Sequence, residues 1–373
     1  MTNPAVSTAP MPRRTVSVLP SYVAGQRAQS EMIASLASNE SHYAPLPSVL
    51  DVVAHSAARL NRYPDSGAVV LRERIAEHLG VTAGEVAIGP GSVGVLQQII
   101  VSLCDPGDEV VFAWRSFEAY PLLVTLAGAR PVPVPLGPDE GHDLEAMAAA
   151  MTDRTRIVLL CTPNNPTGVP ITGAAVERFL ATVPPQVLVV IDEAYFEYGT
   201  DPAAVDAIGA YRNHPNVCVL RTFSKAHGLA GLRVGYAIAR PRIADTLRKT
   251  VIPFAVSDLA QQAAVASLDA ESEMRDRVAS VTSERDRVIS RARGAGWDVP
   301  DSQANFVWIR AADDRREGIV KAFAAADILV RGYAGDGVRI TIADSFANDR
   351  VIRVLAELNS VNSAELNSAG DEQ

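Results

Sequence analysis

The chain has 373 residues, 48% hydrophobic and 21% charged, which predicts a globular protein of about two domains and argues against a disordered or fibrous chain. Its formal net charge of -9 is spread over segments of mixed sign, which disfavours a nucleic-acid partner because such a partner needs clustered Lys and Arg. Cys104, Cys161 and Cys218 are too few and too far apart for a disulfide framework or a metal site, so we expect reduced thiols and no metal. No segment has the pattern of a signal peptide or of a membrane span, so we expect a cytoplasmic protein without a membrane partner.

The composition changes along the chain and suggests its organisation. Residues 1–15 and 359–373 are small and polar, so we expect both ends to be poorly ordered. Between them we predict three parts: a segment, residues 16–55, that joins the small domain; a large cofactor-binding domain, residues 56–250; and a small C-terminal domain, residues 251–358.

Seven short apolar runs, which begin at residues 85, 109, 130, 156, 186, 216 and 233, alternate with helical patterns in the large domain. Continuous rather than alternating hydrophobicity is typical of strands covered on both faces. The fold class predicted here is therefore α/β, with a mostly parallel sheet between two layers of helices. In such sheets ligands bind beyond the carboxyl ends of the strands.

A different pattern follows residue 257. A long charged helix is predicted from Asp258 to Arg293, and two shorter strands, "ANFVWIR" and "GVRITIA", flank a helix in "REGIVKAFAAADI". This arrangement predicts a smaller α+β domain.

Polar residues follow three successive strands of the predicted sheet. The runs end in "CTPNNPTG", "DEAY" and "RTFSK". These endings bring to one edge of the sheet Asn165, Asp192, Tyr195, Ser224 and Lys225.

Two of these residues have a plain structural alternative. Asp192 ends a buried strand, where a carboxylate needs a partner, and a helix cap or an ion pair would supply one. Most lysines are solvated, but Lys225 lies between a buried strand and the "GLAG" turn, with Arg233 nearby. That setting would desolvate its amine and lower its pKa, as a Schiff-base lysine requires.

Pyridoxal phosphate needs these groups together: a lysine for its aldehyde, a carboxylate for its ring nitrogen and a cup for its phosphate. Ser224 and Arg233 can contribute to the cup. The glycine-rich "GPGSVGVLQQII" can complete it, because backbone amides at a helix N-terminus favour an anion.

The same glycine-rich stretch contains an alternative. Gly89, Gly91 and Gly94 spell G-x-G-x-x-G, and Asp108 lies near the spacing of a dinucleotide-binding fingerprint. An NAD site would leave the polar residues at the other strand ends without a role, whereas a pyridoxal phosphate site uses all of them.

Together these motifs resemble the fold-type-I pyridoxal-phosphate aminotransferases, in particular the histidinol-phosphate aminotransferase subfamily. The similarity runs from "LASNES" at 36 to "GVRITIA" at 337. Within that subfamily, "FAWRSFEAYP", "SQANFVW" and "RGYAGDGVRIT" look most like the actinobacterial aromatic amino acid (phenylalanine) aminotransferases.

The resemblance implies a role for each residue around the cofactor. Lys225 would form the Schiff base and carry the proton between the substrate Cα and the cofactor, and Asp192 would pair with the ring nitrogen. Asn165 and Tyr195 would hydrogen-bond the ring's 3′ oxygen. Phe117 would stack on the ring. The phosphate would be held by Ser92, Val93, Ser224 and Arg233.

The resemblance also implies how substrate and subunits are held. Arg339 matches the arginine that binds the substrate α-carboxylate, with Arg331 and Asn165 assisting. Tyr63 matches a tyrosine that reaches the phosphate of the neighbouring subunit's cofactor, which implies a homodimer with shared active sites. One departure is Ala343, which stands where many relatives have glycine.

The expected activity is transfer of an amino group between aromatic L-amino acids, namely phenylalanine and tyrosine with tryptophan as a further candidate, and 2-oxo acids such as 2-oxoglutarate. The nearest alternative is histidinol-phosphate transamination, for which Arg331 and Tyr22 could help to bind a second phosphate. A pyridoxal decarboxylase or lyase is another alternative. A ligand-sensing regulator is disfavoured, because too few residues precede "LASNES" for a DNA-binding domain.

Overall fold

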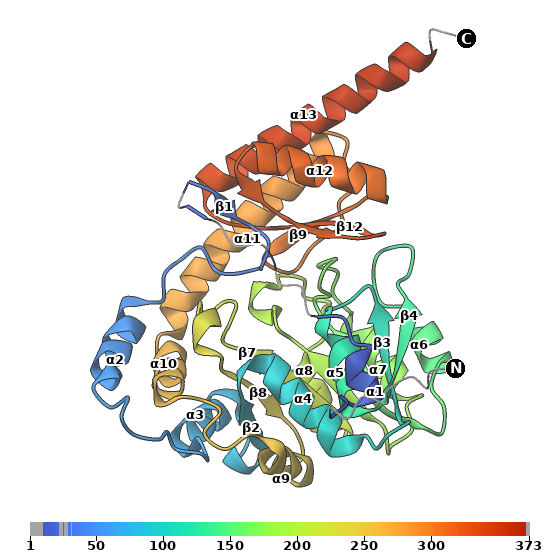
Figure 1. Ribbon diagram of the computed structural model, residues 1–373. Helices are drawn as coiled ribbons and strands as arrows, with labels where there is room; N and C mark the ends of the chain where they lie inside the picture. Colours follow the sequence, from blue (N-terminus) through green and yellow to red (C-terminus); the bar gives the residue numbers. More distant parts are fainter. Residues whose placement is uncertain (1–9, 22–24, 26–28, 31, 371–373) are drawn as a thin grey trace, which may run out of the picture.

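The computed structural model describes residues 10–21, 25, 29–30 and 32–370, with residues 360–370 as backbone alone (Figure 1). Residues 1–9 of the predicted disordered N-terminus, and Tyr22, lie outside this part of the chain. Within the described residues, no helix is both long enough and apolar enough to cross a membrane.

The large domain is built on a seven-stranded sheet, and the predicted α/β class is confirmed. Its strand order is β2-β8-β7-β6-β5-β3-β4, and only β8 runs antiparallel to its neighbours. All seven predicted strands are present: β2 Val86–Gly89, β3 Glu109–Trp114, β4 Arg130–Pro135, β5 Thr155–Cys161, β6 Leu188–Asp192, β7 Val217–Thr222 and β8 Gly235–Ile238.

Helices cover both faces of this sheet because successive strand residues point to opposite sides. In β3, Val110 and Phe112 belong to one apolar cluster, whereas Val111 and Ala113 belong to another. The first cluster is closed by α4 Gly91–Leu103, α5 Ala119–Ala127 and α9 Pro241–Thr250. The second is closed by α3 Val69–Leu79, α6 Leu144–Ala149, α7 Gly173–Leu180 and α8 Ala207–Asn213.

The small domain lies beyond the carboxyl ends of the parallel strands (Figure 1). Its antiparallel sheet has the order β11-β12-β9, and α12 Asp313–Ala325 packs against β11 and β12. These strands are β9 Phe306–Arg310, β11 Arg331–Tyr333 and β12 Gly337–Thr341. A separate parallel pair, β1 Ala34–Ser35 with β10 Ile328–Leu329, ties the N-terminal segment to this domain.

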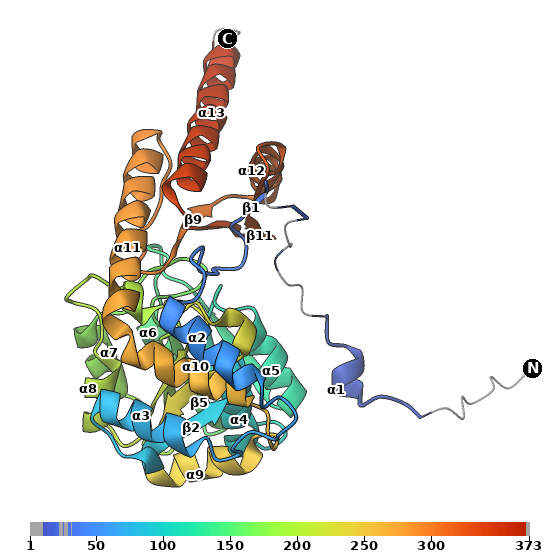
Figure 2. The same ribbon diagram turned by 90° about the vertical axis from the view of Figure 1, so that its left-hand side faces the viewer.

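The predicted single helix from Asp258 to Arg293 is two helices, α10 Asp258–Asp269 and α11 Glu271–Gly294. They meet at Ala270, whose φ of -97° and ψ of 29° depart from helical values. The reason is tertiary: α10 packs on α2 Pro47–Ala57 and on α3, whereas α11 packs on α13 Ser345–Gly370 (Figure 2).

The last helix, α13, enters the C-terminal tail for which poor order is predicted from residue 359 onward, and that expectation remains a prediction. The backbone of α13 continues as a helix to Gly370. The predicted domain boundaries remain predictions.

Candidate active site

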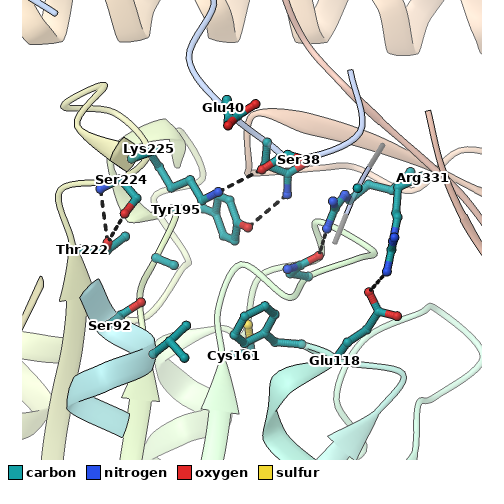
Figure 3. A pocket seen from close by; sticks show the side chains of 18 of the residues that line it. Ser38, Glu40, Ser92, Glu118, Cys161, Tyr195, Thr222, Ser224, Lys225 and Arg331 are labelled. Carbon is teal, nitrogen blue, oxygen red and sulfur yellow. Dashed lines mark hydrogen bonds and ion pairs between the residues drawn. The ribbon is translucent and has the colours of Figure 1, made fainter. Parts of the chain in front are cut away.

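A cavity of about 390 Å³ lies at the carboxyl edge of the large sheet. The large domain, the small domain and the "LASNES" segment all contribute to its wall. Every predicted site residue except Tyr63 lines this cavity. Figure 3 shows that Lys225 and Tyr195 project into it from the large-domain side, with Arg331 on the opposite wall.

Lys225 follows β7 and is held by the N-terminal segment. Its Nζ donates a hydrogen bond to the carbonyl oxygen of Ser38 at 3.1 Å, and it lies 5.7 Å from the centre of the Tyr195 ring. Burial, followed by the nearby positive charge of Arg339, lowers the pKa of Lys225 to about 7, while Glu40 opposes this shift. A lysine in this environment can supply a neutral amine near physiological pH.

The lowered pKa predicts how covalent capture of pyridoxal phosphate by the cofactor-free protein depends on pH. The neutral form of Lys225 increases as pH rises through about 7, so the capture rate should rise between pH 6 and 8 and then level off. A lysine with an ordinary pKa would instead give a rate that still rises at pH 10. Stopped-flow absorbance measures the rate, and a continued rise to pH 10 would contradict the assignment.

Asp192 is the last residue of β6 and is buried. Its Oδ2 accepts a hydrogen bond from the Tyr120 hydroxyl at 2.7 Å, whereas its Oδ1 is buried without a hydrogen-bond partner. Burial raises the pKa of Asp192 to about 6, and the bond from Tyr120 opposes this shift. An oxygen left unpaired beside a cavity is a place for a ligand's N–H.

The opposite end of the cavity has the features of an anion cup. Ser92 and Val93 lie in the first turn of α4 and line the cavity, and the N-terminus of a helix favours an anion. Arg233 Nη1 donates to Ser224 Oγ at 3.3 Å. A side chain at Gly91 would be strained by its φ of +75° and would displace the Arg233 guanidinium, and a Cβ on Gly235 would collide with the backbone amide of Ser92.

These features fit pyridoxal phosphate. The unpaired Asp192 Oδ1 is suited to a protonated ring nitrogen, the Ser92 and Arg233 cup to a phosphate, and Lys225 to an aldehyde. Phe117 also lines the cavity, and its ring meets the Tyr120 ring edge-on at 5.6 Å.

A hydrogen-bond network holds the side chains on the small-domain side. Arg339 donates through Nη1 to Asn165 Oδ1 and through Nη2 to the carbonyl oxygen of Ala37, the latter at 2.8 Å. Its Nε is buried without a partner. Asn39 donates to the Tyr195 hydroxyl at 3.0 Å, and burial raises the pKa of Tyr195 above its ordinary value.

Tyr63 is far from this network. Its side chain is 82% exposed and stacks on Phe254 with ring centres 4.6 Å apart. Leu60, Val70 and Ile252 are further exposed apolar residues. The predicted contact of Tyr63 with a cofactor therefore requires a second subunit.

Ala343 fits its position without strain. It is not among the described residues with a positive φ, and its amide donates to Asn348 Oδ1 at 3.1 Å, in the turn that leads into α13. The turn thus needs no glycine.

Three polar residues of the site were not predicted from the sequence: Tyr120 beside Asp192, Asn39 beside Tyr195, and Glu118 beside Arg331. Two of them lie in "FAWRSFEAYP" and the third in "LASNES", both quoted above for their resemblance to a family. Among the described residues no group of three or more His, Cys, Asp or Glu side chains could hold a metal ion.

Comparison with known proteins adds to this geometry. The family model for aminotransferases of class I and II matches residues 31–355. An aromatic amino acid aminotransferase of Streptomyces coelicolor is 51% identical over 352 residues, which cover 94% of this chain and 98% of that protein. One of Thermobifida fusca is 51% identical over 347 residues, or 92% of this chain and 96% of that protein.

Solved structures share the fold. A histidinol-phosphate aminotransferase of Sinorhizobium meliloti, in complex with pyridoxal-5'-phosphate, has a TM-score of 0.86 at 28% identity and covers 95% of this chain and 99% of its own. A Thermus thermophilus aspartate aminotransferase variant has a TM-score of 0.80 at 22% identity, and the match covers 94% of this chain and 100% of that one.

Proposed function

Because the chain belongs to the class I and II aminotransferases, and is thus a transaminase that uses pyridoxal phosphate, we propose that it exchanges amino groups between aromatic L-amino acids and 2-oxo acids such as 2-oxoglutarate. The observation that carries the proposal is the convergence of Lys225, Asp192 and Arg339 on one cavity. The two relatives named above, both aromatic amino acid aminotransferases about half identical to this chain, support the choice of substrate.

The residues divide the work between cofactor and substrate. When bound, pyridoxal phosphate supplies the sink for the electron pair left when the substrate Cα–H bond breaks. Lys225 Nζ accepts the Cα proton of the amino donor in one half-reaction and returns a proton to Cα of the acceptor in the other. Asp192, ionised, holds a proton on the ring nitrogen.

Arg339 orients the substrate by its α-carboxylate. The guanidinium is anchored to Asn165 and Ala37, and both contacts are to neutral acceptors, so its positive charge stays available for a carboxylate. Its planar fork matches the two carboxylate oxygens, which a lysine ammonium cannot do. Arg339 is buried, and a contact between charges is stronger in a buried site than in water.

Arg339→Lys should therefore lower kcat/KM for phenylalanine by about 10²- to 10⁴-fold, because charge-assisted hydrogen bonds contribute about 1.5–3 kcal/mol each. The absorbance of bound cofactor should not change. Arg310→Lys is the control, since Arg310 is an arginine on the neighbouring strand β9 that pairs with Glu140 outside the cavity. An unchanged kcat/KM, or release of carbon dioxide instead of a 2-oxo acid, would contradict the proposal and favour a decarboxylase.

The substrate is tested by comparing amino acceptors. With glutamate as donor, kcat/KM should be higher for phenylpyruvate than for imidazole-acetol phosphate. The second candidate, histidinol-phosphate transamination, is favoured by the S. meliloti fold neighbour and by Arg331 in the cavity wall. A preference for the phosphate substrate would establish that candidate in place of ours.

We further propose a homodimer in which Tyr63 completes the partner's phosphate cup. The exposed ring of Tyr63, stacked on the partly exposed ring of Phe254, supports an interface at this face. Mixing Lys225→Ala with Tyr63→Ala subunits should restore activity, because one site of each mixed dimer keeps both residues. Absence of recovery after subunit exchange, shown by native mass spectrometry, would exclude shared sites.

A further inference from the structure

Two arginines lie side by side on adjacent strands of the small-domain sheet. Arg331 of β11 is the register partner of Arg339 of β12, and directly opposed residues of antiparallel strands project to the same face. Both line the cavity. They lie 5.7 Å and 5.6 Å, respectively, from the centre of the Tyr333 ring, so they share one wall.

Their electrostatic surroundings differ. Arg339 contacts neutral oxygens, as described above, whereas Arg331 Nη2 donates to Glu118 Oε2 at 2.8 Å (Figure 3). The side chains of Arg331 and Glu118 are 13% and 29% exposed. A carboxylate of the large domain thus balances one of the two guanidinium charges in the wall.

Glu118 is placed to act on the substrate side chain. It precedes α5 and follows Phe117, and both residues line the cavity. Arg339 would hold the α-carboxylate, so the substrate side chain extends toward the remaining wall, where Arg331, Glu118 and Tyr333 lie. The charge of this wall decides which side chains it accepts.

We propose that Glu118 sets the enzyme's balance between uncharged and anionic substrate side chains by neutralising Arg331; this inference rests on the proposed function. An uncharged ring that covered an unbalanced guanidinium would strip its water without replacing it, which is costly. With Glu118 in place that cost falls. An anionic side chain must in turn compete with Glu118 for Arg331, which weakens its binding.

The contact also links the two domains, and a purely structural role has different consequences. Arg310 with Glu140, and Arg115 with Asp336, are further ion pairs between the domains. If Glu118 only held the domains together, its loss would weaken all substrates alike and leave their ratio unchanged.

Glu118→Gln tests the proposal, because glutamine keeps the size and a hydrogen-bond acceptor but removes the charge. The ratio of kcat/KM for imidazole-acetol phosphate to that for phenylpyruvate should rise at least about tenfold, corresponding to about 1.4 kcal/mol. Binding should change in the same direction: the Kd of glutarate should fall relative to that of 3-phenylpropionate in calorimetric titrations of the holoenzyme.

Two control variants test whether the change in the kcat/KM ratio depends on the contact between Glu118 and Arg331. Glu118→Gln combined with Arg331→Gln should abolish the gain, because the guanidinium that Glu118 balances in the wild type is then absent. Glu140→Gln, which breaks an inter-domain pair outside the cavity, should leave the ratio at the wild-type value. Circular dichroism and cofactor absorbance show that each variant is folded and loaded.

The inference is overturned if the ratio in Glu118→Gln stays within about twofold of wild type, if it falls, if Glu140→Gln reproduces the gain, or if the gain persists without Arg331. The proposed function is tested separately, by which of the two amino acceptors has the higher kcat/KM in the wild-type enzyme. An enzyme that favoured imidazole-acetol phosphate from the start would refute that function, yet the change caused by Glu118→Gln would still be measurable.

Discussion

Lys225→Ala should abolish transamination, with kcat lower by at least about 10⁴-fold, because the variant loses both the nucleophilic amine and the proton carrier. The structure motivates this expectation: Lys225 projects into the cavity, and burial together with Arg339 lowers its pKa to about 7. The chain has two other lysines, Lys249 and Lys321, and neither lines the cavity.

Lys249→Ala is the matched control, since Lys249 is exposed and pairs with Asp245 on a surface helix. Borohydride reduction of the yellow protein, followed by peptide mapping, should label Lys225 in the wild type and in this control. No label is expected in Lys225→Ala. A label on Lys249 or Lys321, or a protein that binds no cofactor, would refute the assignment of the site.

Asp192→Asn should lower kcat by about 10²- to 10³-fold, because removing one member of a buried charge pair costs about 2–5 kcal/mol. Asparagine retains the shape but cannot hold a proton on the ring nitrogen by its charge. Tyr120→Phe is a graded comparison: it removes the bond to Asp192 Oδ2 but leaves the carboxylate, and it should cost about tenfold or less. Full activity in Asp192→Asn would contradict the proposed role.

A stability measurement separates this role from a structural one. In the cofactor-free protein burial raises the pKa of Asp192 from 3.8 to about 6, so the folded state binds this proton more tightly than the unfolded state. Stability from this group is present below pH 3.8 and is lost as pH rises through about 6. At pH 7, cofactor-free Asp192→Asn should therefore unfold at a higher temperature than wild type, although the loaded variant is less active.

Much of the large domain could be predicted because its signals are local. Continuous apolar runs identified all seven strands, and the polar residues after three of them identified Asn165, Asp192 and Lys225. Parallel strands end at the same edge of a sheet, so residues far apart in the chain could be placed together without coordinates. Lys225 could be distinguished from an ordinary surface lysine only because Asn165 and Asp192 are predicted to lie at the same edge.

The contacts that refine the site could not be predicted in this way. Glu118 and Arg331 are 213 residues apart, and Asn39 and Tyr195 are 156 apart. In the sequence Glu118 looks like any acidic residue before a helix, and Asn39 like any polar loop residue. Their partners follow from how the small domain and the N-terminal segment pack over the sheet.

The sequence by itself thus determined the fold class, the cofactor and the residues at the strand ends, because apolar runs and the polar residues after them are read along one segment. Tertiary structure alone decided the break at Ala270, the unpaired Asp192 Oδ1 and the pairing of Glu118 with Arg331. Each of these depends on packing between distant segments, where side-chain direction and burial decide which atoms meet.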